Sequence, residues 1–154
     1  MFLQLYPKIN IYYKTKEMTK QQKVRKSKNA VFLMHVHLVF VTKYRKKVFD
    51  SRHLKYIEEL TLHICKQKQC TLKEFNGEKD HIHILIEYPP KLAVTELINL
   101  IKGSSSRRLK QNFPSRKYKF PKGALWSHSY FAGSVGGATL DVVKKYIENQ
   151  DRPN

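Results

Sequence analysis

Two runs in which histidines alternate with apolar residues constrain the fold of this chain most. The first spans residues 31–43, and the second, residues 81–88 (HIHILIEY), ends at Pro89-Pro90. Side chains alternate between the two faces of a strand, so a period of two residues is typical of a half-buried strand. In the first run one face carries His35, His37, Val39 and Val41, and the other carries Met34, Val36, Leu38 and Phe40. The sequence therefore predicts two strands, each with a histidine pair on a single face.

Helical patterns follow each of these strands. After Asp50 or Ser51, either of which suits a helix N-cap, apolar residues recur with the 3.6-residue period of a helix. A second helix is expected over residues 93–111, where the stretch at 103–106 (GSSS) has poor helix propensity. We therefore expect a kink or a close backbone contact in the middle of the second helix.

Weaker signals complete the pattern. One strand is expected over residues 70–75, followed by a hairpin turn at Asn76-Gly77, and another over residues 125–135. Thr139 should cap a last helix over residues 140–150. The order β-α-β-β-α-β with one added C-terminal helix is that of a ferredoxin-like or RRM-like antiparallel sheet, an α+β fold. Its first and third strands are central neighbours, so both histidine pairs should lie on adjacent strands.

The charge of the chain indicates the class of its partner. Its 154 residues suffice for one domain with a buried core, and its formal net charge is +18. Such an excess attracts phosphate backbones and makes binding fall with salt, although any basic protein shares this property. No apolar stretch is long enough for a membrane span and no signal-peptide pattern is visible, so we expect a cytoplasmic protein without a membrane partner. Cys65 and Cys70 match no zinc spacing and are expected to be reduced thiols.

Residues 1–29 have the character of an N-terminal extension. Residues 20–28 (KQQKVRKSK) form a basic run of the kind that is solvated and mobile, and Met18 offers an alternative start. We therefore predict a flexible basic extension over residues 1–29 and one folded domain over residues 30–154.

The histidine pairs are candidate metal ligands. Neutral imidazoles two residues apart on a strand can chelate one ion, and imidazole suits Mn or Zn well and Mg less so. His81 and His83 form one such pair, and His35 and His37 form the other. A polar, half-exposed sheet face is the simpler interpretation of either pair taken alone.

A tyrosine on the expected last helix is a candidate nucleophile. Tyr146 and Gln150 lie one helical turn apart on the same face, and Lys144 and Lys145 adjoin the tyrosine. A phenol needs a metal, a base or nearby positive charge before it attacks. The carboxamide oxygen of Gln150 can complete the coordination shell of such a metal. The alternative is that Tyr146 is a packing residue of an amphipathic helix.

Basic and aromatic residues gather on the second helix and on the loop after it. Positive charge follows a nucleic-acid backbone, and rings stack on unpaired bases. A solvated charged surface is the alternative. The candidate DNA-binding residues are Lys102, Arg107, Arg108, Lys110, Arg116, Lys117, Tyr118 and Lys119.

Together these motifs resemble the single-tyrosine HUH transposases of the IS-200/IS-605 type, in which HUH stands for His, a hydrophobic residue and His. The resemblance covers residues 31–150. It is carried by HLVFVTKYRKKVF at 37–49, HIH at 81–83, LIKGSSSRRL at 100–109, LWSHSYF at 125–131 and YIENQ at 146–150.

The resemblance implies an enzyme that cleaves and rejoins single-stranded DNA at insertion-sequence ends. Tyr146 would attack a phosphate, which forms a 5′-phosphotyrosine and releases a 3′-hydroxyl. His81, His83 and Gln150 would hold Mg or Mn, with His37 in a supporting place. The family further implies a subterminal DNA hairpin as the recognised partner and a homodimer with exchanged tyrosine helices.

Other functions stay open at this point. A non-catalytic RRM-like module would share the element order and the charge, but its central strands should carry aromatic residues where this chain has histidines. A domesticated relative that acts on repeated palindromes would share every motif named above. A rolling-circle initiator is disfavoured by the small size of the chain.

Overall fold

Six main elements of the computed structural model follow the order β-α-β-β-α-β. The structure describes residues 25–114, 124–136, 144–145, 147–150 and 152–153. The elements are β3 (His35–Thr42), α2 (Ser51–Gln67), β4 (Thr71–Gly77), β5 (His81–Glu87), α3 (Val94–Asn112) and β6 (Trp126–Val135). This order confirms the α+β fold class. Of the expected last helix, residues 144–145 and 147–148 are described and are helical.

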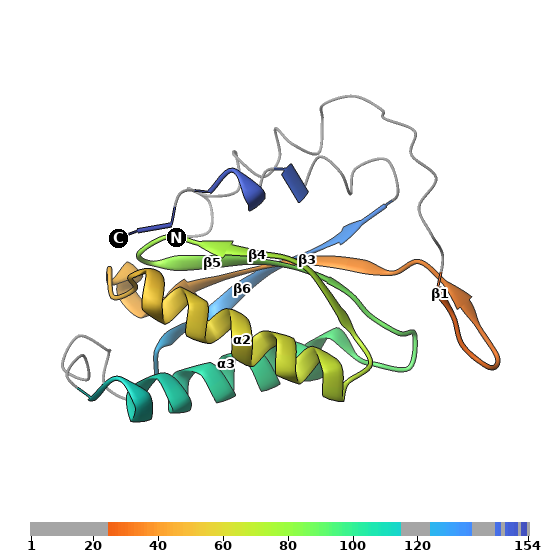
Figure 1. The fold of residues 1–154 in the computed structure, drawn as a ribbon, viewed down its shortest axis with the longest axis horizontal. Helices are drawn as coiled ribbons and strands as arrows, with labels where there is room; N and C mark the ends of the chain where they lie inside the picture. Colours follow the sequence, from red (N-terminus) through yellow and green to blue (C-terminus); the bar gives the residue numbers. More distant parts are fainter. Residues whose placement is uncertain (1–24, 115–123, 137–143, 146, 151, 154) are drawn as a thin grey trace.

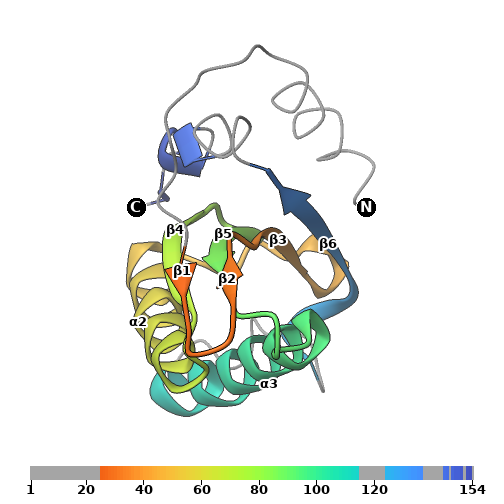
Figure 2. The same ribbon diagram turned by 90° about the vertical axis from the view of Figure 1, so that its right-hand side faces the viewer.

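The four long strands form one antiparallel sheet in the order β4-β5-β3-β6. Because β3 pairs with both β5 and β6, the strands that carry the two histidine pairs are central neighbours, as the sequence predicts. The helices α2 and α3 lie side by side on one face of the sheet, and the described C-terminal residues lie over the opposite face (Figure 1, Figure 2).

The hydrophobic core lies between the sheet and the two helices. Its strand residues alternate along β3 and β5, and its helix residues recur at helical spacing. It includes Val36, Leu38, Phe40, Ile82, Ile84, Ile86, Leu54, Ile57, Leu97, Ile98 and Ile101. A shift of either strand by one residue would turn histidines into this core, so the burial pattern specifies the register.

Local interactions fix where α2 begins. Asp50 is the N-cap, and its Oδ1 accepts hydrogen bonds from the main-chain N–H groups of Arg52 at 2.9 Å and His53 at 3.3 Å. In return His53 Nδ1 accepts from the N–H of Asp50 at 3.0 Å, so a histidine completes a reciprocal cap. Of the two expected N-cap residues, Asp50 and Ser51, Asp50 is the one that caps the helix.

A kink or a close backbone contact is expected at Gly103 in the second helix, but the structure shows neither a break in the helix nor such a contact. α3 continues through Gly103, and a Cβ at Gly103 would meet nothing within 4 Å. The serines of this stretch instead fasten β6 to the helix. Ser105 Oγ donates to the Ile101 carbonyl at 2.6 Å and accepts from Trp126 Nε1 at 2.8 Å, which satisfies polar groups within the core.

The predicted hairpin turn at Asn76-Gly77 is also wrong. Both residues belong to β4, where Asn76 pairs with His83 and Gly77 pairs with Ile82. The turn follows them, over residues 78–80. A Cβ at Gly77 would come within 2.5 Å of the His81 carbonyl, so this glycine serves a close approach of two strands.

A small hairpin precedes the sheet. β1 (Arg25–Lys26) pairs with β2 (Val31–Phe32), so the strand expected over residues 31–43 is divided into β2 and β3. Arg25 anchors the hairpin, since its Nε lies 3.1 Å from Glu87 Oε1 and its guanidinium donates to the Gln69 carbonyl at 3.0 Å. Residues 25–29 of the basic extension therefore take part in the fold. Among the described residues, no helix has both the length and the apolar character that a membrane span requires.

Candidate active site

Three histidines meet on the sheet face that α2 and α3 leave uncovered. In the register of β3 against β5, Val39 pairs with His83 and Val41 with His81. His37 lies two residues from Val39 on the same face, diagonally next to His83. His37, His81 and His83 are all buried. The pairing of the two central strands thus brings the two histidine motifs together.

His37 and His83 form a hydrogen-bonded pair. Nε2 of His37 lies 3.1 Å from Nδ1 of His83, and the rings are stacked with centroids 5.4 Å apart. Burial lowers the pKa of His37 to about 4. Burial, and then the proximity of His37 and His81, lower the pKa of His83 well below its usual value. Both imidazoles are therefore neutral near pH 7, which is the form that coordinates metals.

His81 is oriented by a carboxylate. Its Nδ1 lies 2.7 Å from Asp80 Oδ1, and the other carboxylate oxygen, Oδ2, accepts from Arg45 Nε at 3.1 Å. Burial alone would raise the pKa of Asp80, but the hydrogen bond and charge of His81 and those of Arg45 outweigh it and lower the pKa. A carboxylate bound to Nδ1–H keeps the proton there and leaves Nε2 as the ligating nitrogen, an arrangement that is common at metal sites.

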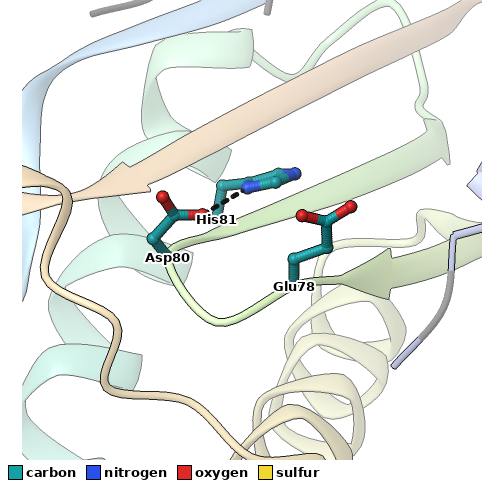
Figure 3. A group of neighbouring side chains, drawn as sticks. All are labelled: Glu78, Asp80 and His81. Atoms are coloured by element: carbon teal, nitrogen blue, oxygen red, sulfur yellow. Dashed lines mark hydrogen bonds and ion pairs between the residues drawn. The ribbon is translucent and has the colours of Figure 1, made fainter. Parts of the chain in front are cut away.

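Two acidic residues in the β4–β5 turn extend this group. Glu78, Asp80 and His81 each offer a ligand atom, and these atoms lie within 4.8 Å of one another. Figure 3 shows the two carboxylates on either side of the His81 ring. His83 is next to them, with its ring centroid 5.1 Å from that of His81. Sequence reasoning missed Glu78 and Asp80, although acidic residues directly before a His-x-His pair are a usable signal.

The C-terminal segment is docked beside the histidines through Asn76. This buried residue pairs with His83 across the strands, and its Nδ2 donates to the carbonyls of Ile147, at 3.1 Å, and Gln150. Its Oδ1 accepts from the N–H of Gly77 and from Arg152 Nε, both at 3.0 Å. The side chain of Asn76 thus makes all four of its hydrogen bonds, and three of them hold the C-terminal segment.

Further contacts support the same docking. Arg152 reaches Glu58 of α2, with 2.7 Å between its guanidinium nitrogen and Oε2. Lys144 Nζ lies 3.5 Å from Glu74 Oε1 on β4. The main chain of Gln150, a predicted metal ligand, is thereby brought to the strand residue that faces His83. Tyr146, the predicted nucleophile, lies outside the described residues.

The predicted DNA-binding residues have different surroundings. Lys102 is partly buried, and its ammonium donates to the carbonyls of Ser127 at 2.7 Å and His128 at 3.3 Å, while burial lowers its pKa. It therefore helps to fasten α3 to β6. Arg107 and Arg108 are exposed on α3, and Lys110 is half-buried. The loop residues Arg116, Lys117, Tyr118 and Lys119 lie outside the described residues.

Comparison with known proteins identifies a family. The model of the family described as "Transposase IS200 like" matches residues 30–150. The "Transposase for insertion sequence element IS200" of Salmonella typhimurium is 32% identical over 114 residues, which cover 74% of each chain. The "ISDra2 transposase TnpA" of Deinococcus radiodurans is 28% identical over 127 residues, covering 82% of this chain and 91% of that protein.

Solved structures agree with this match. The crystal structure of a transposase from Deinococcus radiodurans superposes with a TM-score of 0.67 at 28% identity, over 83% of this chain and 98% of that one. A REP-associated tyrosine transposase bound to a REP hairpin gives a TM-score of 0.53 at 6% identity, over 85% and 68% of the two chains. The second match shows a shared fold.

Proposed function

Because the chain belongs to the IS200-like transposase family, we propose that it cleaves and rejoins single-stranded DNA at insertion-sequence ends, with Tyr146 as the nucleophile. The observation that supports this most is the cluster of buried histidines on the sheet face opposite α2 and α3. It lies within the matched residues 30–150 and beside the docked segment that carries Tyr146 and Gln150.

The residues of this cluster fit a divalent metal. His81 has Nδ1 engaged by Asp80 and so presents Nε2, and the lowered pKa of His83 keeps its imidazole neutral. We propose His81, His83 and Gln150 as the ligands of Mg or Mn, with Asp80 and His37 orienting the two histidines. Such an ion, when bound, polarises a scissile phosphate and offsets its developing charge.

The proposed reaction exchanges one bond of a phosphodiester for another. The phenolic oxygen of Tyr146 forms a bond to phosphorus, and the bond from phosphorus to the 3′ oxygen breaks. The 3′ oxygen leaves as a hydroxyl, and the phenol gives up its proton. The reverse attack by a 3′-hydroxyl restores the phosphodiester and frees the tyrosine, so rejoining needs no ATP. Asn76 contributes by binding the main chain of Ile147 and Gln150, next to Tyr146 in the sequence.

The proposed substrate is DNA with a hairpin next to a single-stranded end. The structural neighbour bound to a REP hairpin supports a hairpin as partner, and the exposed Arg107 and Arg108 offer charge for its phosphates. We propose that Lys102, Lys110 and the loop residues Arg116, Lys117, Tyr118 and Lys119 add to this surface. A domesticated relative that acts on repeated palindromes is the second candidate, favoured by the same neighbour.

Covalent capture of DNA tests the function. The full-length protein with Mg²⁺ should form a protein–DNA adduct on a denaturing gel when it is given single-stranded end sequences that flank its gene. Tyr146→Phe should bind the same DNA and form no adduct. An adduct formed by Tyr146→Phe would identify another nucleophile and contradict the proposal. Cleavage of dispersed genomic palindromes, with the ends of the element left intact, would favour the domesticated relative.

We further propose a homodimer in which the tyrosine helices are exchanged between subunits. In the single chain, residues 147–150 contact β4 of the same chain. A mixture of Tyr146→Phe and His83→Ala chains separates the two arrangements. Exchange restores one intact site in each mixed dimer, so the mixture should cut DNA that neither variant cuts alone. An inactive mixture with confirmed mixed dimers would exclude exchange.

A further inference from the structure

The loop between β3 and α2 contains two consecutive residues in the left-handed backbone region. Tyr44 has a φ of 60° and Arg45 a φ of 51°. Residues with a Cβ adopt this region at a cost, and such strain persists only where the surroundings hold it. In this loop the surrounding chain holds the backbone in place. The N–H of Thr42 donates to the Asp80 carbonyl and the N–H of Lys43 donates to the Leu125 carbonyl, both at 2.8 Å.

This backbone conformation directs the side chains of Arg45 and Tyr44 into different surroundings. Arg45 reaches Asp80, which orients His81. Tyr44 instead stands in solvent with 74% of its surface exposed, the most exposed large hydrophobic side chain in the described part of the chain. Lys43 Nζ lies 5.5 Å from the centre of its ring. A firmly held loop thus presents an aromatic ring and a cation next to the residue that supports the candidate active site.

A cleft of about 630 Å³ begins at the same loop. It is lined by Arg45, Lys47, Glu78, Lys79, Asp80, Arg152 and Pro153. The two carboxylates belong to the group around His81, so the cleft opens beside the candidate active site. Lys47 and Lys79 are exposed, and neither ammonium has an ion-pair partner among the residues that the structure describes. The main-chain N–H groups of Val48 and Phe49 donate to the Lys79 carbonyl at 3.0 Å each, which fixes the two lysine-bearing segments together.

We propose that this cleft binds the single-stranded DNA that adjoins the cleavage point, with Lys47 and Lys79 at its phosphates and Tyr44 stacked on a base. Unpaired ammonium groups follow a phosphate backbone, and an exposed ring accepts any unpaired base. A duplex has no free base face to offer, so the ring points to a single strand. The proposal rests on the proposed function for its substrate, but its test measures binding and needs no cleavage.

Affinity for two probes separates the roles of the ring and the lysines. The probes are a fluorescent (dT)12 and a 12-mer of abasic sites, titrated with full-length protein that carries Tyr146→Phe. Tyr44→Leu should weaken (dT)12 binding by roughly 10-fold and leave abasic binding unchanged, while Tyr44→Phe should keep the original affinity. Lys79→Ala and Lys47→Ala should each weaken the binding of both probes. Each should also lower the slope of log affinity against log salt by about 0.7. Lys66→Ala, an exposed lysine on α2, is the matched control and should change neither.

Photocrosslinking gives a second measurement on the unsubstituted loop. A 12-mer of 5-iododeoxyuridine, irradiated with the same protein, should attach to the peptide that contains Tyr44. Equal binding of both probes by Tyr44→Leu and its parent, or crosslinks that map only to other peptides, would overturn the role of Tyr44. Unchanged binding by the two lysine variants would overturn the cleft as a phosphate path. Failure of the wild-type protein to form a DNA adduct would contradict the proposed function. The binding measurements would still test the cleft, because they do not depend on cleavage.

Discussion

The two ends of β5 carry the same pair of groups, a buried histidine beside a carboxylate, in different surroundings. At one end His81 Nδ1 lies 2.7 Å from Asp80 Oδ1. At the other end His35, on the neighbouring strand β3, has Nε2 3.3 Å from Glu87 Oε2. Neither ring nitrogen of His35 makes a hydrogen bond to another described residue. All four residues are buried. Residue type and burial therefore do not distinguish the two ends of β5.

The residues around each histidine–carboxylate pair distinguish the two ends. Glu87 is surrounded by cations, with Arg25 Nε at 3.1 Å from one carboxylate oxygen and Lys73 Nζ at 3.7 Å from the other, and these contacts tie the β1–β2 hairpin to the sheet. Asp80 contacts the cation of Arg45, has a second carboxylate nearby in Glu78, and lies beside a cleft. A histidine–carboxylate pair supports a ligand site when another donor and an entry path accompany it. Otherwise, as at His35 and Glu87, the pair has a structural role only.

Removal of the histidine at each end should give the largest contrast. His81→Ala should lower the rate of Mg²⁺-supported adduct formation at least about 100-fold, because stabilisation of phosphate charge is lost. His35→Ala should keep that rate within about 3-fold, since His35 belongs to the structural end. Gel-based kinetics on the same DNA measure both, with excess EDTA as the zero-rate control. Equal losses in the two variants would break the distinction between the ends.

Removal of the carboxylate charge should give the next largest contrast. Asp80→Asn should weaken Mn²⁺ binding about 10- to 100-fold, since the carboxylate that orients His81 is lost. Glu87→Gln should leave Mn²⁺ affinity unchanged and lower the free energy of unfolding, because Arg25 and Lys73 lose their partner. Calorimetric titration of Mn²⁺ and urea unfolding measure the two effects. A shift of Mn²⁺ affinity in Glu87→Gln would show that the far end takes part in binding.

Asn76 and Thr71 sharpen the comparison along β4, because they pair with His83 and Glu87 respectively. Asn76→Ala removes the bonds to the C-terminal segment and should cost about 1–3 kcal/mol of stability. It should also expose residues 144–150 to proteolysis and slow adduct formation. Thr71→Ala, at an exposed position, is the control and should change neither property. An intact C-terminus in Asn76→Ala under limited proteolysis would contradict the docking role of Asn76.

The smallest expected effect is a pH dependence at the structural end. Burial lowers the pKa of His35 more than the charge of Glu87 raises it, and Lys73 lowers it further. The unfolded chain therefore binds more protons than the folded one as pH falls through 6.5, so the free energy of unfolding should decrease in that range. His37 and His83 act in the same direction. Urea unfolding at pH 7.5 and 5.5 should show a smaller decrease in His35→Gln than in the parent. An equal decrease would assign the dependence to the other histidines.

Local signals in the sequence were sufficient for much of the fold. The alternation along β3 and β5, the cap at Asp50 and the apolar spacing of the helices each depend on residues close together in the chain. The expectations that failed concern glycines. Gly77 permits two strands to approach, and Gly103 lies in an uninterrupted helix. Because a glycine tolerates a turn, a close contact or a helix, its role depends on what the rest of the fold brings near it.

The sequence by itself determined the order of the elements, the His-x-His pair at 81–83 and the family to which they belong, because these are patterns of neighbouring residues. Tertiary structure decided which side chains meet. The pairing of β3 with β5 joins His37 to His83, the β4–β5 turn sets Glu78 and Asp80 beside His81, and Asn76 receives the chain end more than 70 residues later. The contacts of His37 with His83 and of Asn76 with the C-terminal segment depend on strand register and long-range packing, which no local pattern records. The acidic residues before His81 are close to it in the sequence, and the turn decides only how their side chains point.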